Sequence, residues 1–306
     1  MRIFGVGVEM RSKRIGVLLC LLVVPFASAP AGAGTSRVAR NPYVGAIVVE
    51  AESGAVLLED GADRKGYPAS VVKLMDLLIV LEAIDSGHLQ LEERVTVTRE
   101  AARMGGSQVY LAENEVFTLE DLLYALMIQS ANDAAVALAV HIAGSKEAFV
   151  ELMNERARKL GMTSTRFQSP HGLPPARGQL PDVTTARDIA LLARELLRRS
   201  DVVKYTSTRE RSFRDGKFTL RSHNKLLDSF AGCDGLKTGY TYSAGFSVAA
   251  TALRDRTRLI AVVLGSESSR TRDRKAAELL AKGFETVPSL ITAAERHTTG
   301  PFLDVQ

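Results

Sequence analysis

Cysteine is scarce in this sequence of 306 residues, which contains only Cys20 and Cys233. Cys20 lies in an N-terminal segment that we expect to be removed, and the one cysteine left cannot form an internal disulfide. Long apolar runs, repeats and low-complexity tracts are also absent, which argues against a multi-span membrane protein or a repeat array. With 46% hydrophobic and 24% charged residues, the chain is predicted to be globular and stable through its core alone.

The first 33 residues have the pattern of a signal peptide. Three basic residues, Arg11, Lys13 and Arg14, precede the apolar run Ile15–Phe26, which is shorter than the roughly 20 residues of a membrane span. Small residues follow, and we expect cleavage after Ala31-Gly32-Ala33. The sequence therefore predicts export to the periplasm or another extracytoplasmic site. An uncleaved N-terminus that keeps the protein at the membrane is the alternative.

A dense block of basic residues is missing as well. The whole chain carries a net charge of +4 and has a pI near 9.1. Removal of residues 1–33 leaves 35 basic and 34 acidic residues, a net charge of +1. Since the Lys and Arg residues are also scattered, the charge gives no case for a nucleic-acid partner.

Strand-like segments lie at both ends of the chain. Residues rich in β-branched or alternating apolar side chains, bounded by turn signals, predict strands over Tyr43–Glu50, Ala55–Leu58, Phe218–Arg221, Gly235–Thr241, Gly245–Leu253 and Arg258–Gly265. A helix over Arg272–Phe284 is expected to close the domain. The fold class is therefore predicted as mixed α and β, with an antiparallel sheet built from both chain ends and a helical lobe inserted.

The middle of the chain is predicted to be helical. Apolar periodicity and capping signals predict helices over Ser70–Ser86, Thr118–Met127, Ala131–Ile142, Lys146–Leu160 and Ile189–Arg199. Four prolines and two glycines make Ser169–Pro181 a loop, which we expect near the functional site. We expect one catalytic domain over residues 34–287 and a short C-terminal tail over 288–306.

Three short motifs occur in order along the chain: Ser70-Val71-Val72-Lys73, Ser130-Ala131-Asn132 and Lys237-Thr238-Gly239. Together they are typical of active-site serine enzymes that recognise penicillin. Each is weak alone, because Ser222-His223-Asn224-Lys225 also satisfies two of the patterns. Only Ser70 opens a long apolar helix, on which residues three apart are neighbours.

The residue types suit nucleophilic catalysis. A serine needs a base, and Lys73 can act as one only when neutral, which requires burial and a nearby cation such as Lys237. Free N–H groups at the start of the helix favour an oxyanion that develops beside Ser70. Ser130 can pass a proton to a leaving amine.

The remaining motif residues suit substrate binding. Asn132 can hydrogen-bond a substrate backbone, and Lys237 and Thr238 can hold a terminal carboxylate. Gly239, in an expected edge strand, lets a substrate backbone approach closely. Ordinary roles also exist for each motif, such as helix capping by Ser70 or a surface turn at Lys237, but three motifs in order on suitable elements favour the catalytic interpretation.

With these motifs the chain resembles the D-alanyl-D-alanine carboxypeptidases, low-molecular-mass penicillin-binding proteins of peptidase family S11. The similarity covers roughly Tyr43–Val287 and includes Pro68-Ala69-Ser70, Lys73-Leu74-Met75, Gly106-Ser107, Ser130-Ala131-Asn132-Asp133-Ala134-Ala135, Leu160-Gly161-Met162, Pro170-His171-Gly172-Leu173, Thr185-Ala186-Arg187-Asp188 and Asp234-Gly235-Leu236-Lys237-Thr238-Gly239-Tyr240-Thr241. It departs from many members at Val72, Ala131 and His223, where Thr, Gly and Arg respectively are frequent.

The resemblance implies a β-lactamase/DD-peptidase-like fold, with Ser70 as nucleophile, Lys73 as base and Ser130 as proton relay. Asn132, Lys237, Thr238, Gly239 and Tyr240 would contact the substrate, and the N–H groups of Ser70 and Tyr240 would form the oxyanion hole. His171 is expected to be structural and Cys233 a small buried residue. Neither a metal, nor a cofactor, nor an obligate protein partner is implied.

The expected reaction is removal of the terminal D-alanine from peptidoglycan stem peptides through an acyl-enzyme on Ser70, with β-lactams as inhibitors at the same serine. Three alternatives stay open. A DD-endopeptidase would use the same site on cross-linked peptides. A class A β-lactamase would need a deacylating glutamate, and Glu151 lies too early and in an expected helix. The third is a non-catalytic module that binds β-lactams or cell wall.

Overall fold

The computed structural model describes residues 37–199 and 201–298, with side chains as far as residue 287, and these residues belong to one compact unit. The expected signal segment, residues 1–33, lies outside the described residues. Within the described part of the chain, no helix is both long enough and apolar enough to span a membrane.

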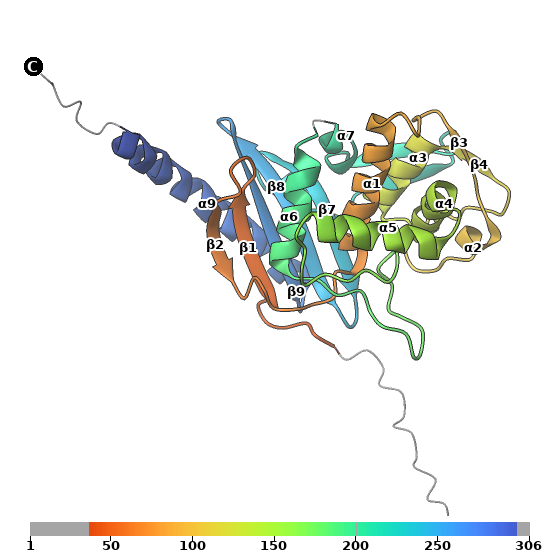
Figure 1. The fold of residues 1–306 in the computed structure, drawn as a ribbon, viewed down its shortest axis with the longest axis horizontal. Helices are drawn as coiled ribbons and strands as arrows, with labels where there is room; N and C mark the ends of the chain where they lie inside the picture. Colours follow the sequence, from red (N-terminus) through yellow and green to blue (C-terminus); the bar gives the residue numbers. More distant parts are fainter. Residues whose placement is uncertain (1–36, 200, 299–306) are drawn as a thin grey trace, which may run out of the picture. The chain divides into compact units, whose positions relative to one another are not determined.

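A five-stranded antiparallel sheet forms the centre of the fold (Figure 1), in the order β2-β1-β9-β8-β7. Its strands are β1 (Gly45–Glu50), β2 (Val56–Asp60), β7 (Cys233–Thr241), β8 (Gly245–Arg254) and β9 (Thr257–Ser266). The N-terminal hairpin joins the C-terminal strands through β1 and β9, where Val48 lies opposite Ala261. The predicted sheet built from both chain ends is therefore confirmed, and β7 is at its edge.

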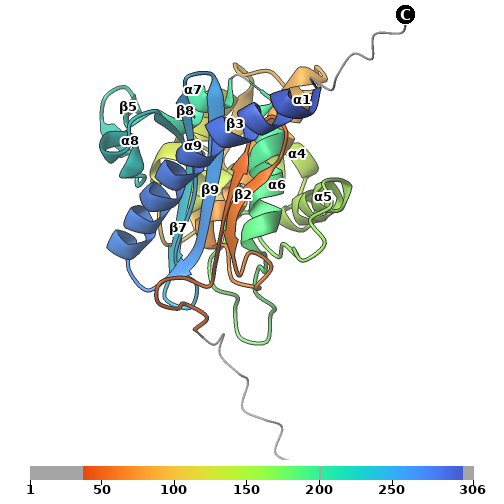
Figure 2. The ribbon, with the colours of Figure 1, turned by 90° about the vertical axis from the view of Figure 1, so that its left-hand side faces the viewer.

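Alternation along the strands divides the core between the two faces of the sheet. Ile47 and Val49 of β1 face one core, and Ala46 and Val48 face the other. Helix α6 (Ala186–Leu197) packs on the first face, and α9 (Ser269–Thr298) crosses the second (Figure 2). The sheet is therefore covered on both faces, and an extended segment can still pair with it at the free edge of β7.

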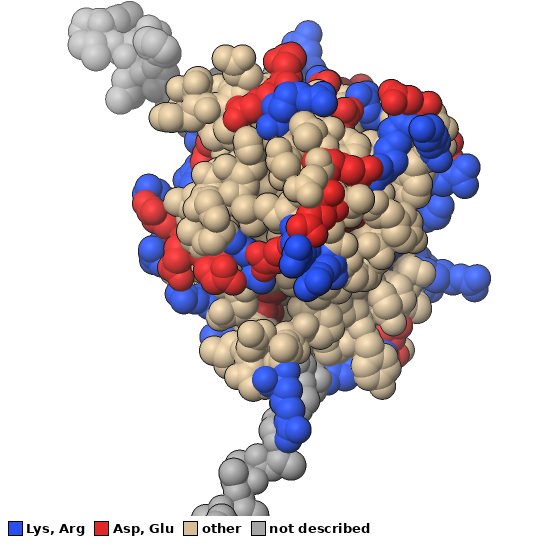
Figure 3. Space-filling model, turned by 90° about the vertical axis from the view of Figure 1, so that its right-hand side faces the viewer, with Lys and Arg blue, Asp and Glu red and all other residues tan. Residues whose placement is uncertain are grey.

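The helical lobe lies between β2 and β7 in the sequence. It contains η1 (Ala69–Val72), α1 (Lys73–Asp85), β3 (Arg94–Thr96), α2 (Arg99–Ala102), β4 (Val116–Thr118), α3 (Leu119–Tyr124), η2 (Ala125–Gln129), α4 (Asn132–Ala143) and α5 (Lys146–Lys159). After α6 follow α7 (Val202–Thr206), β5 (Glu210–Phe213), β6 (Phe218–Arg221) and α8 (Leu226–Ser229). On the face of the lobe shown in Figure 3, acidic and basic side chains are interspersed.

Three helices differ from the sequence predictions in their type or in where they end. The helix expected from Ser70 starts with the 3₁₀ turn η1, and regular α-helix begins at Lys73. The helix expected as far as Met127 changes at Ala125 into the π-helical turn η2, a form common near functional sites. Helix α9 passes the predicted end at Phe284 and runs through Pro288 to Thr298, so part of the expected tail is helical.

Asn154, buried on α5, attaches this helix to the segment that leads into the cleft loop. Its Nδ2 donates to the carbonyls of Val150 and Phe167, at 2.9 Å each, and its Oδ1 accepts the Phe167 N–H at 2.9 Å. These bonds satisfy both backbone groups of a buried residue.

Asn154→Ala is expected to lower the free energy of unfolding by about 2–3 kcal/mol, because the Phe167 groups lose their partner. Chemical denaturation measures the change. The control is Glu155→Ala, an exposed position on the same helix, with an expected change below about 0.5 kcal/mol. Equal stability of the two variants would contradict this role of Asn154.

Candidate functional site

A cleft of about 590 Å³ opens between the helical lobe and the edge strand β7. Its lining includes Ser70, Ser130, Asn132, Thr238, Gly239 and Tyr240. The structure therefore brings residues of all three motifs to one cavity, although 167 positions separate the first motif from the last. Lys73 and Lys237 lie beneath the surface, 0% and 2% exposed.

Ser70 and Lys73 contact each other directly. The Lys73 Nζ lies 3.1 Å from the Ser70 Oγ, 2.8 Å from the Asn132 Oδ1 and 2.9 Å from the His171 carbonyl oxygen. The amide oxygen and the carbonyl are acceptors only. A neutral amine can therefore donate its two N–H bonds to them and turn its lone pair toward the Ser70 hydroxyl.

The protonation of Lys73 is governed by its burial. Burial lowers the pKa of Lys73 to about 8, while the nearby carboxylates of Asp76, Asp182 and Asp133 oppose this effect. The pKa of Lys237 is lowered well below its ordinary value, first by burial and then by the positive charges of Lys73 and Arg272. Burial is thus the main reason why a neutral Lys73 is accessible near physiological pH.

The second motif lies at the junction of η2 and α4. Ser130 has a left-handed backbone, with φ of 60° and ψ of 33°, and is 3% exposed. Such a conformation is strained in a residue other than glycine, and it occurs often at functional sites. Asn132 accepts from Lys73, and its Nδ2 donates to the Gly105 carbonyl at 2.7 Å. The Asn132 side chain is therefore fixed in orientation.

Strand β7 carries the third motif along the cleft. Lys237 Nζ donates to the carbonyl of Thr238 at 3.1 Å, and Thr238 is 6% exposed at the cleft wall. Tyr240 is 53% exposed and stacks on Phe246, with ring centroids 4.1 Å apart. As an edge strand, β7 leaves half of its backbone groups free to pair with an extended chain in the cleft.

Two glycines allow other segments to approach the Ser70 turn. A Cβ on Gly239 would lie 2.6 Å from the Pro68 carbonyl oxygen, and one on Gly172 would lie 2.1 Å from the Ala69 carbonyl oxygen. Gly172 also has a φ of +74°. Gly239 also lines the cleft, where we expect it to let a substrate backbone approach, and it makes room in addition for the protein's own backbone at Pro68.

The other sequence candidates take minor positions. The His171 carbonyl binds Lys73 and its Nδ1 accepts the Leu173 N–H at 3.1 Å, while burial lowers the pKa of the imidazole to about 3. Burial raises the pKa of the partly buried Cys233 to about 11. Ser222 borders the cleft, but its Oγ accepts the Asn224 N–H at 3.2 Å. The helix that follows Ser222 in the chain is the short α8.

One prominent residue of the cleft, Arg272, lies outside the three sequence motifs. Arg272, in the first part of α9, is 5% exposed and lines the cavity, where Asp273 binds its guanidinium at 2.8 Å. It adds a positive charge near Lys237 and His223. No short motif surrounds it, so only its placement at the start of the last helix could have identified it.

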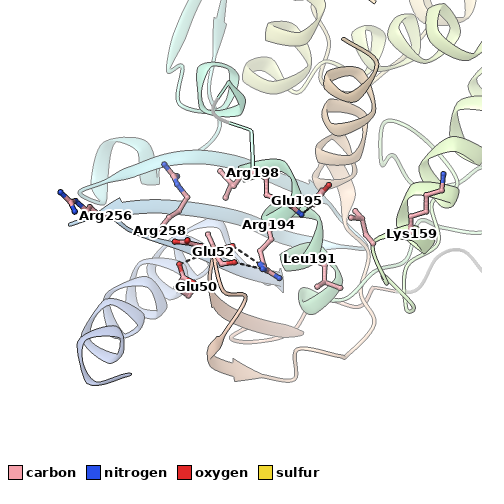
Figure 4. Close-up of a pocket in the computed structure, with 12 residues that line it drawn as sticks. Glu50, Glu52, Lys159, Leu191, Arg194, Glu195, Arg198, Arg256 and Arg258 are labelled. Atoms are coloured by element: carbon pink, nitrogen blue, oxygen red, sulfur yellow. Dashed lines mark hydrogen bonds and ion pairs between the residues drawn. The ribbon is translucent and has the colours of Figure 1, made fainter. Parts of the chain in front are cut away.

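A larger hollow, about 700 Å³, lies elsewhere, beside the β1–β2 turn and α6 (Figure 4). It contains none of the motif residues. Its central Arg194 donates to the carbonyls of Ala51 and Glu52 at 3.1 and 3.0 Å, and Arg258 is paired with Asp234 at 2.7 Å. These guanidinium groups hold the hairpin and strand ends together, so we place the functional site at the smaller cleft. Over the described ranges, no cluster of His, Cys, Asp and Glu side chains could hold a metal.

Comparisons with known proteins agree with this placement. Residues 41–268 match the family model of D-alanyl-D-alanine carboxypeptidase, peptidase S11. The chain is 35% identical to the D-alanyl-D-alanine carboxypeptidase DacF of Bacillus subtilis, over 88% of the chain and 69% of that protein. It is 39% identical to DacC of Escherichia coli, over 85% of the chain and 66% of that protein. It thus spans about two thirds of the length of these relatives.

A solved structure shows the same fold. Penicillin-binding protein D2 from Listeria monocytogenes, in its ampicillin-bound form, superposes with a TM-score of 0.72 and 34% sequence identity, over 79% of this chain and 97% of that one. The family model covers well over half of the chain, and the three motifs lie in one cleft on the matching fold. The chain therefore belongs to the D-alanyl-D-alanine carboxypeptidase family, peptidase family S11.

Proposed function

We propose that this protein is a serine-type D-alanyl-D-alanine carboxypeptidase that removes the terminal D-alanine from peptidoglycan stem peptides. The observation that carries the proposal is the contact between the Ser70 Oγ and a buried Lys73 amine in a cleft bordered by an edge strand. An extended peptide can pair with that strand and place its last peptide bond beside Ser70. Family membership supplies the substrate class.

The proposed acylation step uses neutral Lys73 as general base. Lys73 takes the Ser70 hydroxyl proton while Oγ attacks the carbonyl carbon of the penultimate D-alanine. The Ser130 hydroxyl gives its proton to the leaving nitrogen as the C–N bond breaks, and it receives in turn the proton that Lys73 took from Ser70. D-alanine departs, and Lys73 is neutral again. Water then attacks the ester carbonyl while Lys73 takes its proton. The ester C–O bond breaks, and Lys73 returns the proton to the Ser70 oxygen, which restores the free enzyme.

Charge in the cleft supports binding of a terminal carboxylate. Arg272 and Thr238 line the cleft, and Lys237 lies buried beneath its surface, next to Thr238 in the chain. His223, where many relatives have Arg, adds little charge, because burial and Lys237 lower its pKa to about 4. A substrate carboxylate would favour the protonated form of Lys237, so binding and protonation are coupled at this wall.

β-Lactams are proposed to acylate Ser70 as well. The Listeria relative has been solved in ampicillin-bound and cefotaxime-bound forms, and the cleft residues that would receive such a ring are present here. We also propose that the protein acts outside the cytoplasm, where its peptidoglycan substrate lies, after export directed by residues 1–33.

Ser70→Ala is expected to abolish both D-alanine release from a pentapeptide ending in D-Ala-D-Ala and covalent labelling by a fluorescent penicillin. Enzymatic D-alanine detection and in-gel fluorescence measure the two effects, with Ser222→Ala as the control that keeps both. Release by Ser70→Ala at the wild-type rate would refute the mechanism. Labelling of wild type without peptide turnover would favour a binding module, and cleavage of only a cross-linked dimer would favour an endopeptidase.

The rate of acylation is expected to rise with pH toward a midpoint near 8, because Lys73 must lose its proton to act as base and its pKa is about 8. Well below that pH the rate should increase about tenfold per unit. Stopped-flow measurement of fluorescent-penicillin acylation between pH 6 and 8 tests this. A constant rate over that range would rule out Lys73 as the titrating base.

Gly172→Ala is expected to lower the acylation rate about 100-fold, since the added Cβ displaces the turn that holds Ser70. Gly178→Ala is the matched control. Gly178 has a φ of +86° in the same loop, but no atom lies within 4 Å of its Cβ position. Both positions have a positive φ, at which any side chain is strained, so the two variants differ mainly in the close contact at Gly172. Similar acylation rates in the two would show that this contact does not position Ser70.

A further inference from the structure

One buried carboxyl group beside the cleft has no part in the mechanism above. Asp76 lies on α1 one helical turn after Lys73, and its side chain is completely buried. Neither carboxyl oxygen has a hydrogen-bond partner within the described residues. A buried carboxyl group without donors is destabilising. Its presence in an otherwise apolar stretch of helix therefore indicates a role other than stability.

Two other buried carboxylates near Lys73 show what a structural role looks like. Asp133 accepts three backbone N–H groups and Asp182 accepts two, together with a hydroxyl. The donors are Val109, Leu111 and Ala134 for Asp133, and Gln168, Ser169 and the Ser169 hydroxyl for Asp182, at 2.6 to 3.2 Å. Both aspartates tie loops to the site, whereas Asp76 ties no segment.

The interaction that remains for Asp76 is charge. Among the three carboxylates that raise the pKa of Lys73 against the effect of burial, Asp76 has the largest influence. In turn, burial raises the pKa of Asp76 well above its ordinary value, and the charge of Lys73 opposes that shift. The two groups therefore titrate as a coupled pair.

The other titratable groups around Lys73 come from different elements. Lys237 lies on β7, and burial followed by the charge of Lys73 lowers the pKa of Lys237 well below its ordinary value. The imidazoles of His171 and His223 have pKa values of about 3 and 4 and are uncharged at neutral pH. Among these groups, Asp76 is the one on the same helix as Lys73, and its carboxylate form favours the ammonium form of Lys73.

We propose that Asp76 is a positioning residue whose charge, one turn from Lys73, keeps the amine protonated in the resting enzyme and so sets the pH at which Lys73 becomes a base. The proposal rests on the proposed function, in which Lys73 is the base. Lys73 first releases a proton to solvent, and the neutral amine then accepts the proton of Ser70. Asp76 itself makes no contact with the substrate. Asp76 thus lowers the stability of the fold and the acylation rate at low pH, and it raises the pH at which the enzyme becomes active.

The test is the pH dependence of acylation by a fluorescent penicillin in Asp76→Asn, which has nearly the same shape and no charge. The acid limb, the part of the pH–rate profile in which the acylation rate rises with pH, is expected to move to lower pH by roughly one unit relative to wild type. The rate near pH 6 should therefore rise severalfold. Circular dichroism should show a folded protein, with a melting temperature equal to or above that of wild type.

The matched control is Asp85→Asn, which removes a carboxylate from the same helix about 14 Å further along its axis. Its acid limb should coincide with that of wild type. If Asp76→Asn does not fold, Asp76→Ser provides the same test, and failure of both variants to fold would overturn the proposal by showing a structural role. A folded uncharged variant with an unchanged acid limb would also overturn it.

Failure of this proposal is distinguishable from failure of the proposed function. If wild type is labelled at Ser70 and releases D-alanine, but the acid limb does not move in Asp76→Asn, only the role of Asp76 is wrong. If wild type shows no Ser70-dependent labelling, the proposed function itself is wrong.

Discussion

The site depends on a lysine amine that is removed from water and held by acceptors from three segments. Lys73 Nζ contacts Ser70, the side chain of Asn132 and the backbone of His171. Burial of a positive charge is costly, and the same cost makes the neutral base accessible near pH 8. Desolvation of this amine therefore lowers the stability of the fold and at the same time makes Lys73 reactive.

The fold supplies the acceptors by bringing distant segments against the Ser70 turn. Strand β7 and the loop after α5 both pass so close to this turn that only glycine fits, at positions 239 and 172. Asn132 starts α4 directly after the strained Ser130. The left-handed backbone at Ser130, the two glycines and the buried amine form one arrangement, in which each element is destabilising alone and useful in combination.

Much of this could be predicted from the sequence, because the signals are local. Alternating apolar residues identified the β1, β7, β8 and β9 segments, and their positions at both chain ends predicted the antiparallel sheet. The motifs at Ser70, Ser130 and Lys237 identified the residues that meet in the cleft. Strand β6 was also predicted, whereas β3, β4 and β5 were not, since three or four residues carry too short a pattern.

The remainder depends on tertiary contacts that no local pattern encodes. Arg272 lies in no motif, yet α9 brings it into the cleft. The close approach of Pro68 to Gly239 is likewise visible only in the fold. Asp76 belongs to none of the three motifs, and the lack of hydrogen-bond partners at its carboxyl group depends on what surrounds it in the fold.

The most direct test of the account is a titration of the Lys73 amine itself. Protein with ¹³C-labelled lysine can be followed by NMR from pH 6 to 11, with Lys73→Arg to assign the Cε signal. The account predicts a midpoint near 8. A midpoint at the ordinary lysine value of about 10.4 would contradict it, because Lys73 would then be an ammonium ion throughout the physiological range.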